Sequence, residues 1–135
     1  MSKADTSKKT LPEGRYSPMP ENGRFTVAFI MEHEVEFIAP PYPGIKVGDQ
    51  LKLRQVQIGS GNHEEVNESE VPQTLFEFEH IVTSSDVGKE WRVVIPKTFL
   101  LAGNHFGHGH SVWSVNGMEE STSGPHVIFD TRGAS

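Results

Sequence analysis

Three histidines stand close together near the C-terminal end of the sequence and could form a metal site. They are His105, His108 and His110, within the stretch NHFGHGHSVWSVNG at residues 104–117. Histidine is the commonest metal ligand in proteins, so this cluster is a candidate for zinc binding. In an extended strand, residues two positions apart share a face, and His108 and His110 could then chelate one ion together.

The residues around this cluster do not complete a ligand set. A jelly-roll metal site of the cupin type has a carboxylate three or four residues after its His-x-His pair. Here serine, valine and tryptophan follow the pair, and the nearest carboxylates, Glu119 and Glu120, come after an Asn-Gly turn. A third ligand would have to come from elsewhere, such as His80 or His126. We therefore predict a glycine-rich turn leading into a strand, with no metal or cofactor. A metal-binding jelly roll or metalloenzyme built on the three histidines is the alternative.

Other catalytic chemistry finds little support in the sequence. The chain has no cysteine, which excludes thiol nucleophiles, disulfides and cysteine-ligated metals. It has no Gly-x-Ser-x-Gly elbow and no glycine-rich phosphate loop that opens a helix. Adjacent carboxylates, such as Glu64 and Glu65, fall in predicted loops that position neither as an acid or a base. We expect a protein that is not an enzyme.

The charge balance argues against nucleic acid as a partner. The chain has 12 Lys and Arg against 18 Asp and Glu, a net charge of −6, whereas a phosphate backbone requires a basic footprint. The apolar runs are strand-sized, short of the roughly 20 residues of a membrane span. The first residues lack the apolar core of a secretory signal. We expect a soluble bacterial protein that is cytoplasmic, or exported without an N-terminal Sec signal.

Strand patterns fill the chain from residue 24 onward. Residues 1–23 are rich in Ser, Lys, Pro, Gly and Glu, which predicts a flexible tail. Over residues 24–37, polar and apolar side chains alternate, which predicts one bent strand or two strands with His33 on the apolar face. Further strands are expected at residues 51–58, 74–83, 91–96, 110–117 and 126–131, with Trp91 and Ile95 facing inward.

Turns and loops separate these strands. The proline-rich residues 39–50 contain Tyr42, a loop aromatic that could stack on a sugar ring, although packing within the turn is the favoured interpretation. Residues 59–73 predict a solvated acidic loop that lacks the spacing of a calcium loop. Residues 97–107 have room for one helical turn. Seven or so short strands without a sustained helical period predict an all-β sandwich at residues 24–135.

Three segments together resemble the immunoglobulin-like β-sandwich modules repeated in large bacterial surface and adhesin-like proteins. The segments are PPYPGIKVGDQLKLR, VGKEWRVVIPKTFLLAG and SVWSVNGMEESTSGPHVIFD, and the resemblance covers about residues 35–131. The matching residues are Pro41, Tyr42, Gly44, Gly48, Asp49, Ile95, Pro96, Trp113, Gly124 and Pro125. Those modules commonly have Trp near the position of Gln55 and Tyr at that of Trp113, so the core here is expected to pack differently.

The resemblance implies a single antiparallel immunoglobulin-like β-sandwich of about seven strands, with a binding or spacer role and no catalysis. We therefore predict a non-catalytic binding or structural module that recognises a protein or glycan partner, with Tyr42 as the candidate ligand-binding residue. A small effector or toxin-like protein is a further alternative. The sequence specifies neither the ligand nor the oligomeric state.

Overall fold

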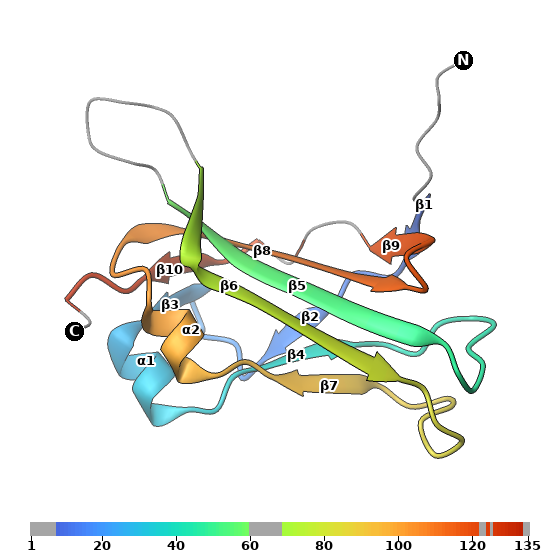
Figure 1. Ribbon diagram of the computed structural model, residues 1–135. Coiled ribbons are helices and arrows are strands. Elements are labelled where there is room, and N and C mark those ends of the chain that lie inside the picture. The colour runs from blue at the N-terminus through green and yellow to red at the C-terminus, as the bar shows by residue number, and fades with distance from the viewer. Residues whose placement is uncertain (1–7, 60–68, 122–123, 125, 134–135) are drawn as a thin grey trace.

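Two β-sheets face each other across one hydrophobic core, and two short helices lie together at one end of them (Figure 1). The helices are α1 (Val27–Glu32) and α2 (Lys97–Leu101). In the part of the chain that is described, no helix is long and apolar enough to cross a membrane. The fold is dominated by β-structure, as predicted. The computed structural model describes residues 8–59, 69–121, 124 and 126–133.

β8 (Phe106–Val115) is the central strand of the larger sheet. β5 (Gln50–Gly59) pairs antiparallel along the whole of one side of it. The other side is shared between two short strands, because β9 (Glu119–Ser121) pairs with the end of β8 and β10 (Ile128–Asp130) with its start, both antiparallel. The strand predicted at residues 110–117 therefore begins earlier, and the glycine-histidine stretch forms part of β8 itself.

Three further strands extend the larger sheet. β1 (Lys8–Leu11) pairs with β9 and β3 (Arg24–Thr26) pairs with β10, and both of these pairs are parallel. The prediction of a wholly antiparallel sandwich is wrong at these two pairs. β6 (Ser69–Ile81) pairs with the side of β5 that faces away from β8. Among the described residues, β6 forms that edge of the larger sheet.

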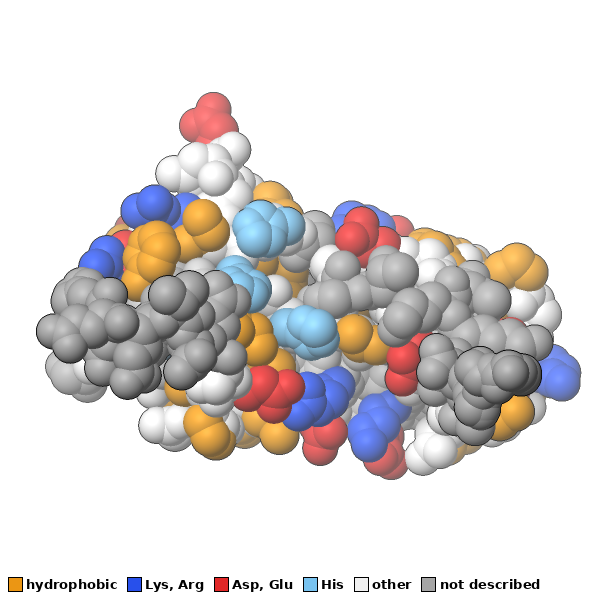
Figure 2. Space-filling view, turned by 90° about the horizontal axis from the view of Figure 1, so that it is seen from above, with side chains coloured by type: hydrophobic (Ala, Val, Ile, Leu, Met, Phe, Trp, Pro, Cys, Tyr) orange, Lys and Arg blue, Asp and Glu red, His pale blue; other side chains and the backbone are white. Residues whose placement is uncertain are grey.

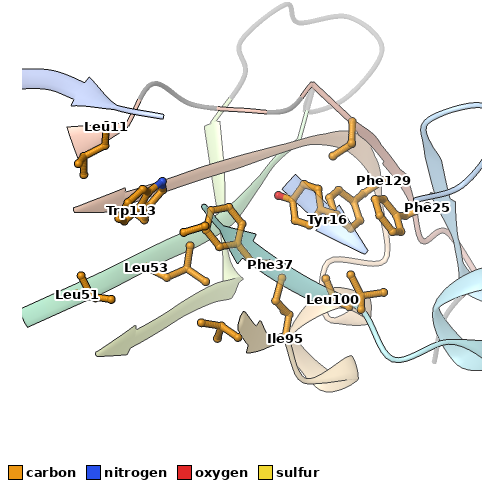
Figure 3. Packing of buried hydrophobic residues seen from close by; sticks show 14 of the residues in the cluster. Leu11, Tyr16, Phe25, Phe37, Leu51, Leu53, Ile95, Leu100, Trp113 and Phe129 are labelled. Carbon is orange, nitrogen blue, oxygen red and sulfur yellow. The ribbon is translucent and has the colours of Figure 1, made fainter. Parts of the chain in front are cut away.

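The smaller sheet has three antiparallel strands. β4 (Glu36–Ala39) lies between β2 (Arg15–Ser17) and β7 (Trp91–Val94). The inward side chains of the smaller sheet pack against those of the larger sheet in the core that Figure 3 shows. The largest fully buried hydrophobic side chains come from both sheets and from the helices, and they include Trp113, Phe25, Phe37, Phe129, Ile30, Ile38, Leu53, Ile95 and Leu100.

Burial alternates strictly along β8 because successive side chains of a strand point to opposite faces. Trp113 and Val115 fill the core at one end of the strand, whereas Gly107 and Gly109 occupy the inward positions at the other. A Cβ atom on Gly109 would lie 2.7 Å from the Phe129 ring, so only glycine lets this ring reach the strand. The glycines between the histidines are thus explained by core packing.

Residues 24–37 were predicted to form one bent strand or two strands, and they form β3 and the start of β4 with α1 between them. The bent strand is therefore wrong, and the two strands are shorter than predicted. The chain leaves β3 at Thr26, whose hydroxyl accepts a hydrogen bond from the backbone N–H of Phe29 and caps α1. Ile30 is buried on the inner side of this helix. His33 ends it and stacks on Phe29 with ring centroids 4.2 Å apart, rather than lying in a strand. Residues 27–31 are all apolar, and such a run fits a strand or a helix equally well, so the Thr26 cap decides for the helix.

The segment predicted as a flexible tail contributes strands to both sheets from Lys8 onward. Leu11 and Tyr16 are 7% and 3% exposed, and the Trp113 indole donates a hydrogen bond to the carbonyl of Pro12 at 2.9 Å. The domain boundary predicted at residue 24 is therefore wrong for residues 8–23. Strands of three or four residues are too short to show alternation, so the pattern missed them. Residues 1–7 lie outside the described chain.

We predict that Tyr16 is essential for stability. Replacing Tyr16 by Phe should cost about 1–3 kcal/mol of unfolding free energy, because the buried oxygens of Gln55 and Ser111 lose their shared partner. Tyr16→Ala should cost about 3–5 kcal/mol because it adds a cavity. Urea denaturation followed by tryptophan fluorescence measures both. Midpoints equal to that of the wild type would show that the segment around Tyr16 does not dock on the core.

Candidate functional site

The predicted histidine cluster is divided between the two faces of the larger sheet. His108 and His110 point outward from β8, and the ring of His126 lies 6.0 Å from that of His108. Histidine side chains gather in the middle of this face (Figure 2). His105 instead makes its contacts on the inner face of the larger sheet, away from His108 and His110. No group of three His, Asp or Glu residues in the described part of the chain has an arrangement that could hold a metal ion.

His105 binds the protein itself. Its Nε2 atom lies 2.7 Å from Oε1 of Gln57, and the amide nitrogen of Gln57 donates to the carbonyl of Leu100 at 2.8 Å. That second bond orients the Gln57 amide, so Nε2 of His105 carries the proton. Burial lowers the pKa of His105, which favours the neutral ring. The His105 ring therefore links the segment before β8 to β5, and Gln57 in turn links β5 to the end of α2. His105 is thus not positioned as a ligand beside His108.

We predict that zinc binds weakly to metal-stripped protein and does not raise its melting temperature, because two or three histidines on one face lack a carboxylate to complete the site. Zinc titration followed by calorimetry and thermal melting tests this, with His108→Ala/His110→Ala as the comparison. A melting temperature that rises by several degrees with zinc, and no longer does so in the double variant, would establish the metal-binding alternative.

Tyr42 is buried in the turn before β5 rather than exposed as a stacking platform. It is 7% exposed, and its hydroxyl donates to Oδ2 of Asp49 at 2.7 Å. Asp49 also accepts from the Lys46 backbone at 2.9 Å and from the Asn116 amide at 3.1 Å. Asn116 and Gly117 have φ angles of 55° and 68°, which confirms the hairpin turn predicted from this pair. Asp49 thus joins two turns.

These hydrogen bonds make the charge of Asp49 a stabilising feature. The Tyr42 hydroxyl, helped by the Lys46 backbone and the Asn116 amide, lowers the pKa of Asp49. Because the folded-state pKa is depressed, this contribution is complete above the unfolded-state pKa of about 3.9 and is lost as the pH falls through the folded-state pKa.

We therefore predict that Asp49→Asn is less stable than the wild type at neutral pH and that the difference shrinks as the pH falls below about 4. Urea denaturation across this range measures the two curves. Tyr42→Phe should reduce the pH-dependent difference, since the phenol is the largest cause of the shift. A stability difference independent of pH would contradict a role for the charged carboxylate.

A cleft with an empty volume of about 330 Å³, its open mouth included, lies where β6 ends and β7 begins. His80 from β6 stacks over Trp91 from β7, with ring centroids 6.3 Å apart and an angle of 21° between the planes. Trp91, predicted to face inward, is half-buried and packs against the hydrophobic core, and it also lines this cleft. The remaining lining residues are Pro40, Pro41, Tyr42, Ile45, Leu51, Asp86, Lys89, Glu90 and Trp113.

Polar groups at the cleft are held in place by a neighbouring turn. Nε2 of His80 lies 2.8 Å from Oδ2 of Asp86. The same carboxylate accepts from the backbone N–H and the hydroxyl of Thr83, and these bonds, with His80, lower the pKa of Asp86 to about 2. The Ser85 hydroxyl forms a hydrogen bond with the Thr83 hydroxyl. That contact does not position Ser85 as a nucleophile for the His80–Asp86 pair.

The chain matches no family model, no curated protein and no solved structure. The candidate site therefore rests on the geometry of the cleft. His80, considered from the sequence as a third metal ligand, pairs with Leu51 on the inner face of the larger sheet, away from the outward His108. Sequence reasoning missed the cleft because Trp91 and His80 come from different strands in different sheets. The only sequence signal was a bulky aromatic at the start of a predicted strand.

Proposed function

We propose that the protein is a non-catalytic recognition module whose cleft at Trp91 and His80 binds a glycan. The observation that carries this proposal is a half-buried indole beside an oriented imidazole, with Asp86, Lys89 and Glu90 at the rim. A sugar ring presents an apolar C–H face and a set of hydroxyls. The first suits an aromatic surface, and the second suits charged acceptors and donors.

The strand order supports an immunoglobulin-like arrangement for this module. β4 and β7 share one sheet, as strands B and E of an immunoglobulin sandwich do. β6, β5, β8 and β9 follow one another in the other sheet, which matches strands C′, C, F and G. β3, β10 and the two helices are additions to that plan. Such a fold hosts many functions, so the glycan proposal rests on the cleft alone.

We predict that at least one of cellohexaose, chitohexaose and maltohexaose binds the protein in isothermal titration calorimetry. Trp91→Ala should weaken that binding by about tenfold or more, because the stacking surface is lost. Trp91→Phe should retain part of the affinity. Val94→Ala, an exposed position of the same strand, is the matched control and should bind as the wild type does.

Circular dichroism of each variant ensures that the comparison is made between folded proteins. Absence of binding for all three oligosaccharides, or binding that is unchanged by Trp91→Ala, would overturn the proposal that this cleft is a glycan site.

A further inference from the structure

We propose that the free edge of β6 binds a second kind of ligand, an extended peptide that alternates basic and apolar residues and adds a strand to the larger sheet. Within the described chain, β6 pairs with β5 alone. Every second residue of an edge strand directs its N–H and C=O groups away from its one neighbour, and another extended chain can bind there. This inference concerns a second ligand and a surface that meets the proposed glycan cleft at His80.

The regular part of the edge is its second half. The β5–β6 register shifts between Gln55 and Gln57, where the residues around Pro72 leave the ladder. The hydroxyl of Thr74 fills the interruption, because it accepts from the Gln57 backbone at 2.9 Å and donates to the Val71 carbonyl at 2.7 Å. From Phe76 to Ile81 the pairing is continuous. A peptide of about six residues matches this length, which is ordinary for a strand.

An apolar gap lies at the middle of this edge. Phe78 stands opposite Leu53 and so shares its inward side, yet Phe78 is 44% exposed whereas Leu53 is fully buried. Its two neighbours on the same side of β6 are covered. Phe76 contacts Phe99 of α2 at 5.2 Å between ring centroids, and His80 lies over Trp91. An added strand with apolar inward side chains would cover the exposed ring between them.

Charge on the other face of the edge selects the partner. Glu77 and Glu79 point outward on β6. The cations nearest Glu77 are Lys52 and Arg54, at 3.9 and 3.8 Å, and both belong to β5. Glu79 accepts a hydrogen bond from Gln50, also on β5. An incoming strand would therefore meet two carboxylates on its outward face, and Lys or Arg there pairs favourably across the strands.

The same carboxylates disfavour a second copy of this chain as the partner. Consider two β6 strands that pair antiparallel with Phe78 facing inward in both copies. With Phe78 opposite Phe78 of the other copy, Glu77 lies opposite Glu79. With Phe78 opposite Phe76 or His80 of the other copy, Glu77 or Glu79, respectively, lies opposite its own copy. Like charges directly opposite each other destabilise a strand pair. The geometry thus points to a different chain with basic outward side chains.

The probe is a labelled peptide of sequence Lys-Val-Lys-Val-Lys-Val, with Glu-Val-Glu-Val-Glu-Val as its charge-reversed counterpart, measured by fluorescence anisotropy. We expect the Lys peptide to bind about tenfold more tightly than the Glu peptide, and Glu79→Lys to remove or reverse that preference. Glu34→Lys, an exposed position outside the sheets with the same change of net charge, should leave the preference intact.

A second comparison separates strand addition from simple charge attraction. Methylating the backbone nitrogens of the three valines removes the N–H donors from one edge of the peptide. Methylating the backbone nitrogens of the three lysines removes them from the other edge. Only one of these two peptides should lose binding, by about tenfold, because only one edge faces β6. Equal binding of both methylated peptides, no binding of the Lys peptide, or a preference unaffected by Glu79→Lys would overturn the proposal. Neither peptide comparison depends on a change at Trp91, so failure of the glycan site leaves this test valid.

Discussion

The hydroxyl of Tyr16 holds the two sheets in one relative position. It donates to Oε1 of Gln55 on β5 at 2.7 Å and shares a hydrogen bond of 2.7 Å with the hydroxyl of Ser111 on β8. The Ser111 hydroxyl also lies 3.1 Å from the carbonyl of Gly124, so its single proton serves either Tyr16 or Gly124. Tyr16, Gln55 and Ser111 are buried, where losing a hydrogen bond is costly, so these contacts favour one arrangement of β2, β5 and β8. Gln55 and Ser111 stand opposite each other in the β5–β8 register, and a slip of one residue would turn one of them to the outer face.

The open flank of the molecule follows from how the two sheets end. β7 has only four residues and lies at the edge of the smaller sheet, while β6 is the long edge of the larger one. α2 covers the flank near Phe76, and the stacked His80 and Trp91 cover it near the turns. Between them the flank is less protected, which is why both candidate ligand surfaces lie along it. The turn at Asp49 supplies the opposite wall of the cleft through Tyr42.

The sequence predicted the strands whose side chains alternate clearly, and it missed the elements that are too short to show a pattern. β5, β7 and the Asn116–Gly117 turn were found because alternation and turn chemistry are local properties. β1 and β2 were missed because three or four residues are too few to show alternation. The helix at 27–32 was read as a strand, since its apolar positions fit both periods until a cap decides between them.

The candidate site was the least predictable part. The histidines near residue 108 attracted attention because they are adjacent in sequence, yet the strand turns His108 outward while His105 binds Gln57. Trp91 and His80 meet only because β6 of the larger sheet ends where β7 of the smaller sheet begins. Proximity in the chain is a poor guide to a site assembled at a sheet flank, because no local pattern records which side chains the fold brings together.

The shared side of β8 has a consequence for how the chain folds. Its two short partners each carry a strand from the start of the sequence, with Lys8 beside Glu119 and Phe25 beside Phe129. These are parallel pairs between remote segments, whose loop-closure entropy must be overcome before they gain any contact. We infer that the β5–β8 ladder assembles first and that this side of the sheet closes last. Until then the outer edges of β9 and β10 are open to pairing with other chains, which favours aggregation during synthesis.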